Sequence, residues 1–228
     1  MATKKKIIDL DEESEGKQWQ EADLIKTFKL NKIKEYQTPL MKEWLEVENP
    51  VFDVVEQAIF DRKHREALLS IEGWSEEDLK MKFITYILDL GLLRDGDGII
   101  GYFDKVISAK VEGITLKVKS DFMVAKGIMN VHEQPYFHFQ EYKPHKKPSG
   151  DSMAQLLEAF LIGQVKNKTP KPLYGLEIIG GTWVFIIMEG KDYCISDNFS
   201  CTKKDDLLKI IAILRKFKHI LMTRLIFD

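Results

Sequence analysis

Two short segments, SDF at residues 120–122 and QEYK at residues 140–143, decide the fold of this chain. Each lies in a stretch of extended character, rich in apolar and aromatic residues, which predicts a β-strand. Residues two apart on a strand face the same side, so Glu141 and Lys143 project together, in a row that also holds Phe137 and Phe139. Two charges that continue an apolar row need partners or a metal ion.

A hairpin between these strands would bring a second carboxylate to Glu141. The turn is expected near residues 128–135. If it is centred on residue 131, Asp121 lies opposite Glu141, roughly 5 Å away between backbones. Two opposed carboxylates repel, and a hard divalent cation with oxygen ligands, most commonly Mg²⁺, removes that conflict. A β-bulge would change the face that Asp121 takes.

Outward from the hairpin, the order of elements predicts an α/β protein with a mixed central β-sheet flanked by helices. Further strands are expected at 173–179 and 182–188, joined by a two-glycine turn, with a short strand ending at Ser196. Helical periodicity and capping residues predict helices over about 50–68, 75–90, 151–165 and 202–224, opened by Asn49-Pro50, by Ser75, by Asp151 or Ser152, and by Thr202.

Charge runs near the start of the chain suggest a domain boundary. Lys4-Lys5-Lys6 precedes an acidic run from Asp9 to Glu15, a pattern typical of a mobile, solvated tail. We therefore expect residues 1–48 to form a charged, partly flexible N-terminal segment with some helical content. Residues 49–228 are expected to form a single α/β domain.

Composition excludes several classes of protein. Lys and Arg number 34 against 36 Asp and Glu, so the chain is no general polyanion binder, and a nucleic-acid site must be a local patch. Its two cysteines are too few for a disulfide scaffold and indicate a reducing compartment. No stretch approaches the ~18 consecutive apolar residues of a membrane span, and residues 1–10 lack the apolar core of a secretion signal. We expect a cytoplasmic protein without a membrane partner.

The pattern Asp121 … Glu141-Tyr142-Lys143 resembles the PD-(D/E)XK nuclease superfamily, although Ser120 stands where the naming proline would be. The context looks closest to the N-terminal nuclease domain of type I restriction enzyme R subunits. There, an acidic helix opening matches Glu76, with Glu77 in reserve, and a glutamine on the following helix matches Gln155. The hairpin Gly180-Gly181-Thr182-Trp183 is similar to an Asn-Gly-x-x-Trp hairpin of those domains, and the resemblance covers about residues 75–200.

The resemblance implies a restriction-endonuclease-like fold and a metal-dependent deoxyribonuclease acting in restriction, phage defence or repair. It implies that Asp121, Glu141 and the Tyr142 carbonyl hold Mg²⁺ or Mn²⁺, and that Lys143, Glu76 and Gln155 complete the catalytic set. DNA would be the partner. A motor or other protein subunit and a homodimer stay open.

Basic residues near these segments are the candidates for contacts with DNA phosphates. They are His145, Lys146 and Lys147, in the loop after the QEYK strand, and Lys126.

Three alternatives that involve no catalysis are also consistent with the sequence. Asp121, Glu141 and Lys143 could be a cross-strand ion pair on a solvated edge, where such pairs contribute at most ~1 kcal/mol. The chain could be a non-catalytic module of the same fold that binds nucleic acid or protein, or a purely structural interaction protein. His138 falls on the face opposite Glu141 and is expected to be packed or hydrogen bonded.

Overall fold

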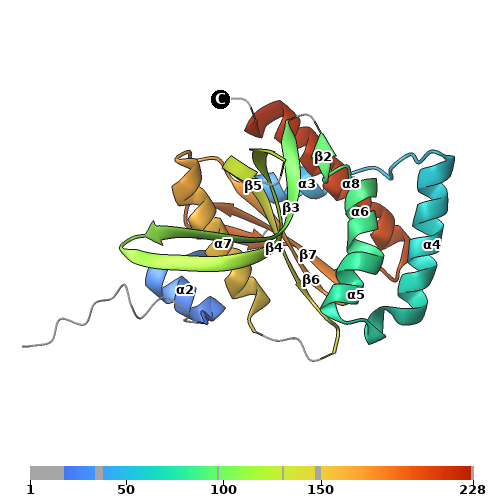
Figure 1. The fold of residues 1–228 in the computed structure, drawn as a ribbon, viewed down its shortest axis with the longest axis horizontal. Helices are drawn as coiled ribbons and strands as arrows, with labels where there is room; N and C mark the ends of the chain where they lie inside the picture. Colours follow the sequence, from blue (N-terminus) through green and yellow to red (C-terminus); the bar gives the residue numbers. More distant parts are fainter. Residues whose placement is uncertain (1–17, 34–37, 97, 130, 147–149, 227–228) are drawn as a thin grey trace, which may run out of the picture.

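A mixed, open β-sheet forms the centre of the computed structural model, which describes residues 18–33, 38–96, 98–129, 131–146 and 150–226 (Figure 1). The strand order is β1-β8-β7-β6-β5-β4-β3-β2, with β9 paired to β7. The predicted class, a mixed sheet flanked by helices, is confirmed. The strands are β1 (Asn31–Ile33), β2 (Asp95–Gly96), β3 (Ile99–Val111), β4 (Ile114–Ile128), β5 (Val131–Lys143), β6 (Leu173–Ile179), β7 (Thr182–Glu189), β8 (Asp192–Ile195) and β9 (Phe199–Ser200).

Helices cover both faces of the sheet and give two apolar cores. One core lies between the sheet and α3 (Pro39–Leu45), α4 (Val54–Ser70), α6 (Thr85–Leu90) and α8 (Lys204–Ile220). The other lies between the sheet and α2 (Glu21–Phe28) and α7 (Ser152–Asn167). The shorter helical turns are η1 (Ile71–Gly73), α5 (Glu76–Leu79), η2 (Lys80–Ile84) and η3 (Leu221–Leu225). No helix in the described ranges is long and apolar enough to cross a membrane.

The predicted helices are present, with differences at their ends. The first begins at Val54 rather than after Asn49-Pro50, because the Asp53 side chain accepts from the backbone N–H groups of Val55 and Glu56 in a capping box. Asp151 caps α7 as predicted. The last helix begins after Lys203 without a side-chain cap, so the expected Thr202 cap is wrong.

Where the structure describes it, the N-terminal segment has the expected helical content, in α2 and α3, and also contains a strand that was not predicted. Strand β1 pairs in parallel with β8 and so extends the sheet. Trp44 is fully buried in the first core, and its Nε1–H donates to the Ile213 carbonyl at 3.0 Å. The part of residues 1–48 that the structure describes therefore belongs to the same folded body as the rest. Residues 1–17, which carry both charge runs, lie outside the described residues.

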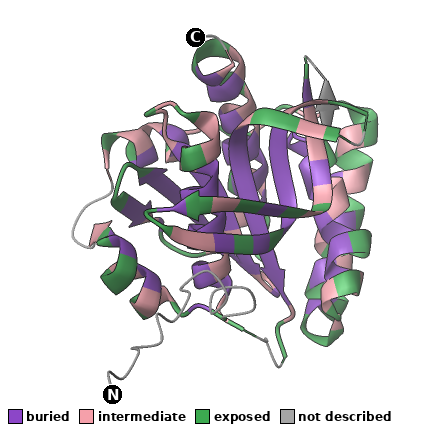
Figure 2. Cartoon of the chain, turned by 60° about the vertical axis from the view of Figure 1, so that its left-hand side comes forward, coloured by how far each residue is buried: buried purple, intermediate pink, exposed green. Residues whose placement is uncertain are grey.

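Strands β3 and β4 form a long ribbon that leaves the sheet halfway along its length. β4 pairs with β3 throughout but with β5 only from Phe122 onward. The remainder of the ribbon curves over α7, where Ile107, Leu116 and Val118 join the second core (Figures 1 and 2). The point at which β4 parts from β5 is the position of Asp121.

Candidate active site

The register of β4 and β5 places Asp121 beside Glu141, as predicted, although the turn lies elsewhere. Phe122 pairs with Gln140, so the numbers of opposed residues sum to 262, whereas Ile128 pairs with Val131, giving 259. Irregularities on either side of Ala125 account for the three-residue difference. They also divide the predicted aromatic row, because Phe137 packs in the first core and Phe139 in the second.

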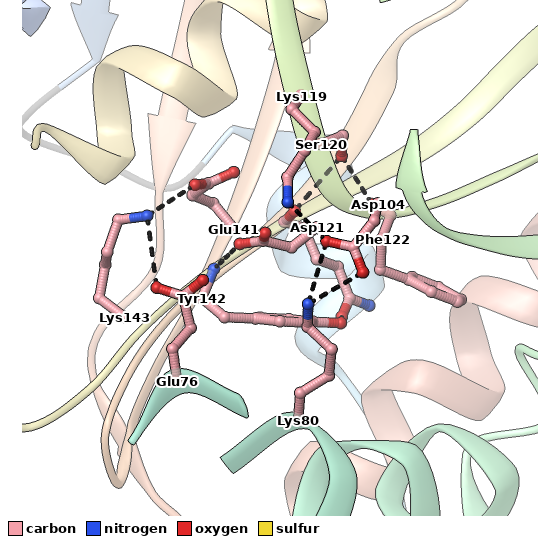
Figure 3. A network of polar contacts seen from close by, with 11 residues as sticks. Glu76, Lys80, Asp104, Lys119, Ser120, Asp121, Phe122, Glu141, Tyr142 and Lys143 are labelled. Carbon is pink, nitrogen blue, oxygen red and sulfur yellow. Dashed lines mark hydrogen bonds and ion pairs between the residues drawn. The ribbon is translucent and has the colours of Figure 1, made fainter. Parts of the chain in front are cut away.

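Asp121, Glu141 and Lys143 meet where the two strands separate (Figure 3). Asp121 Oδ2 accepts from the Tyr142 backbone N–H at 2.7 Å, and Lys143 Nζ donates to Glu141 Oε1 at 2.9 Å. The three residues are only 3%, 2% and 6% exposed. A solvated surface ion pair is therefore excluded as a description of this cluster.

Burial sets the protonation chemistry of the two carboxyl groups. It raises the pKa of Asp121, against the hydrogen bond from the Tyr142 amide. It raises the pKa of Glu141 to about 8, and the nearby Asp121 carboxylate adds to that shift. Burial opposes the charged form of Lys143, but Glu141, Asp121 and Glu76 together raise its pKa. Two carboxyl groups and one ammonium group are thus buried together, and ionisation of both carboxyl groups is disfavoured without a further positive charge.

Glu76 approaches the same cluster from α5, and Glu77 does not. Glu76 Oε2 lies 3.9 Å from Lys143 Nζ, with its side chain 38% exposed. The helix begins there because Ser75 caps the Asp78 N–H while the Asp78 side chain accepts from the Ser75 N–H. Among the described residues, Glu77 has no polar contact with this cluster and is exposed.

The structure adds Lys80 and Asp104, which the sequence reasoning missed. Asp104 falls opposite Asp121, between the paired residues on either side of it, and its backbone φ of 54° is left-handed. Lys80, from the π-helical turn η2, donates to both Asp104 carboxylate oxygens at 3.1 Å, and Lys119 Nζ lies 2.8 Å from one of them (Figure 3). The position of Asp104 could have been predicted from the tight turn at Glu112-Gly113, because a hairpin centred on that turn places residues 104 and 121 opposite each other.

Gln155 shares a surface hollow with Lys143 but not with Asp121 or Glu141. This open hollow of about 380 Å³ lies between the ribbon and the start of α7. The structure thus brings Asp121, Glu141, Lys143 and Glu76 together and leaves Gln155 on the adjacent wall.

The predicted DNA-contacting residues do not all lie together. His145 and Lys146 are exposed in the loop that leaves β5 after Lys143. Lys126 is five residues along β4 from Asp121, or about 17 Å at the rise of a strand, and its Nζ lies 3.4 Å from the Ile226 carbonyl. Lys126 therefore belongs to a different part of the surface. Lys147 lies outside the described residues.

The donor chemistry of the site fits a hard divalent cation. In the described part of the chain, no three Asp, Glu, His or Cys side chains are grouped to hold a metal. Two buried carboxyl groups with raised pKa values are present, and the N–H and C=O of Tyr142 point to the same edge of the strand, toward Asp121. Asp121, Glu141 and the Tyr142 carbonyl are therefore the groups that would hold Mg²⁺ or Mn²⁺.

No protein-family model matches the sequence, and no curated protein matches it.

Proposed function

We propose that this protein is a metal-dependent nuclease of the PD-(D/E)XK type that hydrolyses phosphodiester bonds in DNA, in restriction, phage defence or repair. The observation that carries the proposal is the burial of Asp121 and Glu141 around one ammonium group, where β4 parts from β5. Ionising two buried carboxyl groups beside one ammonium group is costly, so their presence together at a break in strand pairing favours a functional role.

The order of elements supports a restriction-endonuclease-like fold for this site. The α5 helix with Glu76 precedes the β3–β4–β5 meander, and α7 then connects β5 to the parallel strand β6. This order agrees with the pattern on which the resemblance rests, and it supports the proposal to that extent.

The residues divide the chemistry among them. Asp121 and Glu141 would hold the ion, which when bound polarises a phosphoryl oxygen and acidifies a water molecule. Lys143 would stabilise the charge that develops on the phosphate or orient the attacking water. Glu76 approaches within reach of Lys143 and would keep that ammonium charged and in place.

The test is cleavage of single-stranded DNA, double-stranded DNA and RNA by the purified chain during Mg²⁺ and Mn²⁺ titrations. We expect metal-dependent cleavage of DNA and its loss in Asp121→Ala, with the fold retained by circular dichroism. Glu76→Gln should lower the rate several-fold, while the matched control Glu77→Gln should leave it unchanged. An Asp121→Ala variant as fast as the parent would refute the assignment.

A non-catalytic DNA- or protein-binding module of the same fold is the second candidate. The contacts that favour it are the direct Lys143–Glu141 ion pair and the Tyr142 N–H on Asp121, because they satisfy part of the cluster without an ion. DNA binding with no cleavage at any Mg²⁺ or Mn²⁺ concentration would support this candidate.

A further inference from the structure

The hollow beside Lys143 is a feature that the proposed chemistry does not use. It lies between the β3–β4 ribbon, the N-terminal half of α7 and the segment before α2. Its volume of about 380 Å³ is near the lower end of the roughly 300–1,000 Å³ typical of small-molecule sites. A group the size of one nucleotide fits such a space, and a DNA duplex does not.

Glu158 is a buried acid on the wall of this hollow. It is 6% exposed, and its Oε1 accepts from the Lys117 backbone N–H at 3.0 Å, on the edge of β4 that β5 leaves unpaired. Across the described residues, its second carboxylate oxygen has no hydrogen-bond partner. Burial raises the pKa of Glu158 to about 7, so near neutrality this carboxyl can either donate or accept a hydrogen bond.

Gln155 lies one helical turn before Glu158 on α7, and residues at this spacing are neighbours on a helix surface. Its side-chain amide likewise has no hydrogen-bond partner within the part of the chain that the structure describes. An amide and a carboxyl side by side offer both donors and acceptors. Such a pair matches the hydrogen-bonding edge of a nucleobase.

The other walls supply positive charge and an aromatic surface. Lys117 and Lys119 stand exposed on the ribbon, and Lys143 lies at the end nearest the carboxylates. Trp19 adds a largely buried ring that also packs against Phe28, with ring centroids 5.9 Å apart. Ammonium groups and an aromatic wall around polar side chains are the elements by which proteins bind unpaired nucleotides.

We propose that this hollow receives one unpaired nucleotide of the substrate, with its base toward Glu158 and Gln155 and its phosphates toward Lys119 and Lys143. The substrate class is therefore single-stranded DNA, or a duplex with a frayed or displaced strand. The inference rests on the proposed nuclease function, because Lys143 belongs to both sites and thereby sets the nucleotide next to the bond to be cleaved.

The test is fluorescence anisotropy of the full chain with a labelled six-nucleotide single strand and with the corresponding duplex, in EDTA so that no cleavage occurs. We expect the single strand to bind at least tenfold more tightly than the duplex. Glu158→Met, which keeps the side-chain size but removes its polar atoms, should weaken single-strand binding about tenfold. Lys117→Glu should weaken it more, and Lys209→Glu, an exposed reversal on α8 at the opposite face of the sheet, should leave it unchanged.

Two outcomes overturn the inference. One is equal affinity for single strand and duplex. The other is parent-like binding by Lys117→Glu and by a Glu158→Met variant whose thermal unfolding shows it to be folded. Neither depends on hydrolysis. Absence of Asp121-dependent cleavage would refute the nuclease proposal alone, whereas cleavage together with either outcome would refute only the nucleotide site.

Discussion

The last six residues of β5 present two polar rows, both buried, on the two faces of one strand. On one face, His138, Gln140 and Tyr142 form a neutral chain: the Tyr142 hydroxyl donates to Gln140 Oε1 at 2.5 Å, and Gln140 Nε2 lies 2.9 Å from His138 Nε2. On the other face, Glu141 and Lys143 carry charge and meet Asp121. Both rows belong to the same strand, and their side chains are buried to nearly the same extent.

The neutral row is hydrogen bonded within itself except at His138 Nδ1, which is buried and has no hydrogen-bond partner among the described residues, and the row packs against aromatic rings. The ring centroids of His138 and Phe217 are 4.8 Å apart, and those of His138 and Trp44 are 6.4 Å apart. Because Gln140 accepts the tyrosine proton through its oxygen, its amide N–H₂ points to His138 Nε2, which assigns the histidine proton to Nδ1. His138 is therefore packed and hydrogen bonded, as predicted from its face of the strand.

The charged row leaves its electrostatic conflict unresolved. Asp121 raises the pKa of Glu141, and Lys143 is shared with Glu76. The difference teaches that burial alone does not mark a functional site. A neutral polar row bonded along its own length stabilises the fold, whereas a row of ionisable groups with raised pKa values at a break in strand pairing is available for a ligand.

The largest expected effect is a difference in cleavage rate between variants of Lys143 and Tyr142, which are adjacent in sequence but lie on opposite faces of β5. Lys143→Met should lower the rate of DNA cleavage by about 10²–10³-fold, the usual cost of removing one group that stabilises transition-state charge. It should cost little stability, because Glu141 can take up a proton instead. Tyr142→Phe should leave cleavage nearly unchanged. Single-turnover rates with thermal unfolding measure both, and equal rates for the two variants would erase the distinction between the faces.

A smaller effect, a loss of stability, is expected when Gln140, at the centre of the neutral row, is replaced. Gln140→Leu leaves the Tyr142 hydroxyl and the His138 ring without their partner, and each buried unsatisfied group costs about 1–3 kcal/mol. The free energy of unfolding in urea should fall by about 2–4 kcal/mol. Glu141→Gln, on the other face, should lower the free energy of unfolding by less than Gln140→Leu does, or raise it, because it removes a buried acid. The reverse ranking would contradict our description of the two rows.

A third expected effect is a pair of opposite pH dependences of stability. Burial lowers the pKa of His138 to about 3, so the unfolded chain binds its proton near pH 6.5 and the folded chain does not. Its contribution to stability therefore falls as pH decreases from 6.5 toward 3. Burial raises the pKa of Glu141 to about 8, so the unfolded chain releases that proton near pH 4.5 while the folded chain keeps it. That contribution falls as pH increases from 4.5 toward 8.

Each dependence has a slope of up to about 1.4 kcal/mol per pH unit. Urea unfolding between pH 4 and 8 measures both. His138→Phe should flatten the acidic side, and Glu141→Gln should reduce the slope on the alkaline side. If Glu141→Gln changed the pH dependence of stability only at acidic pH, our assignment of the alkaline slope to Glu141 would be wrong.

Patterns within a few residues were enough to predict much of the fold. The strands at Leu173–Ile179 and Thr182–Glu189 agree with the predicted ranges almost to the residue, because alternation and the Gly180-Gly181 turn are local. The Ser75 capping box and the Asp151 cap are local too. The position of Asp121 beside Glu141 was also predicted, although the predicted turn was misplaced and irregularities in β4–β5 pairing restored the register.

Only the tertiary structure decided which of these polar groups are buried together. Glu76 and Lys80 come from a helix 41 or more residues before Asp121, and no spacing rule places them beside it. No local pattern shows where Trp44 packs, and its contact with α8 appears only in the folded structure. The sequence by itself determined the strands, caps and alternating faces, since these depend on neighbours along the chain. Burial, excess charge and the hollow beside α7 depend on distant segments that meet in space, and therefore required the folded structure.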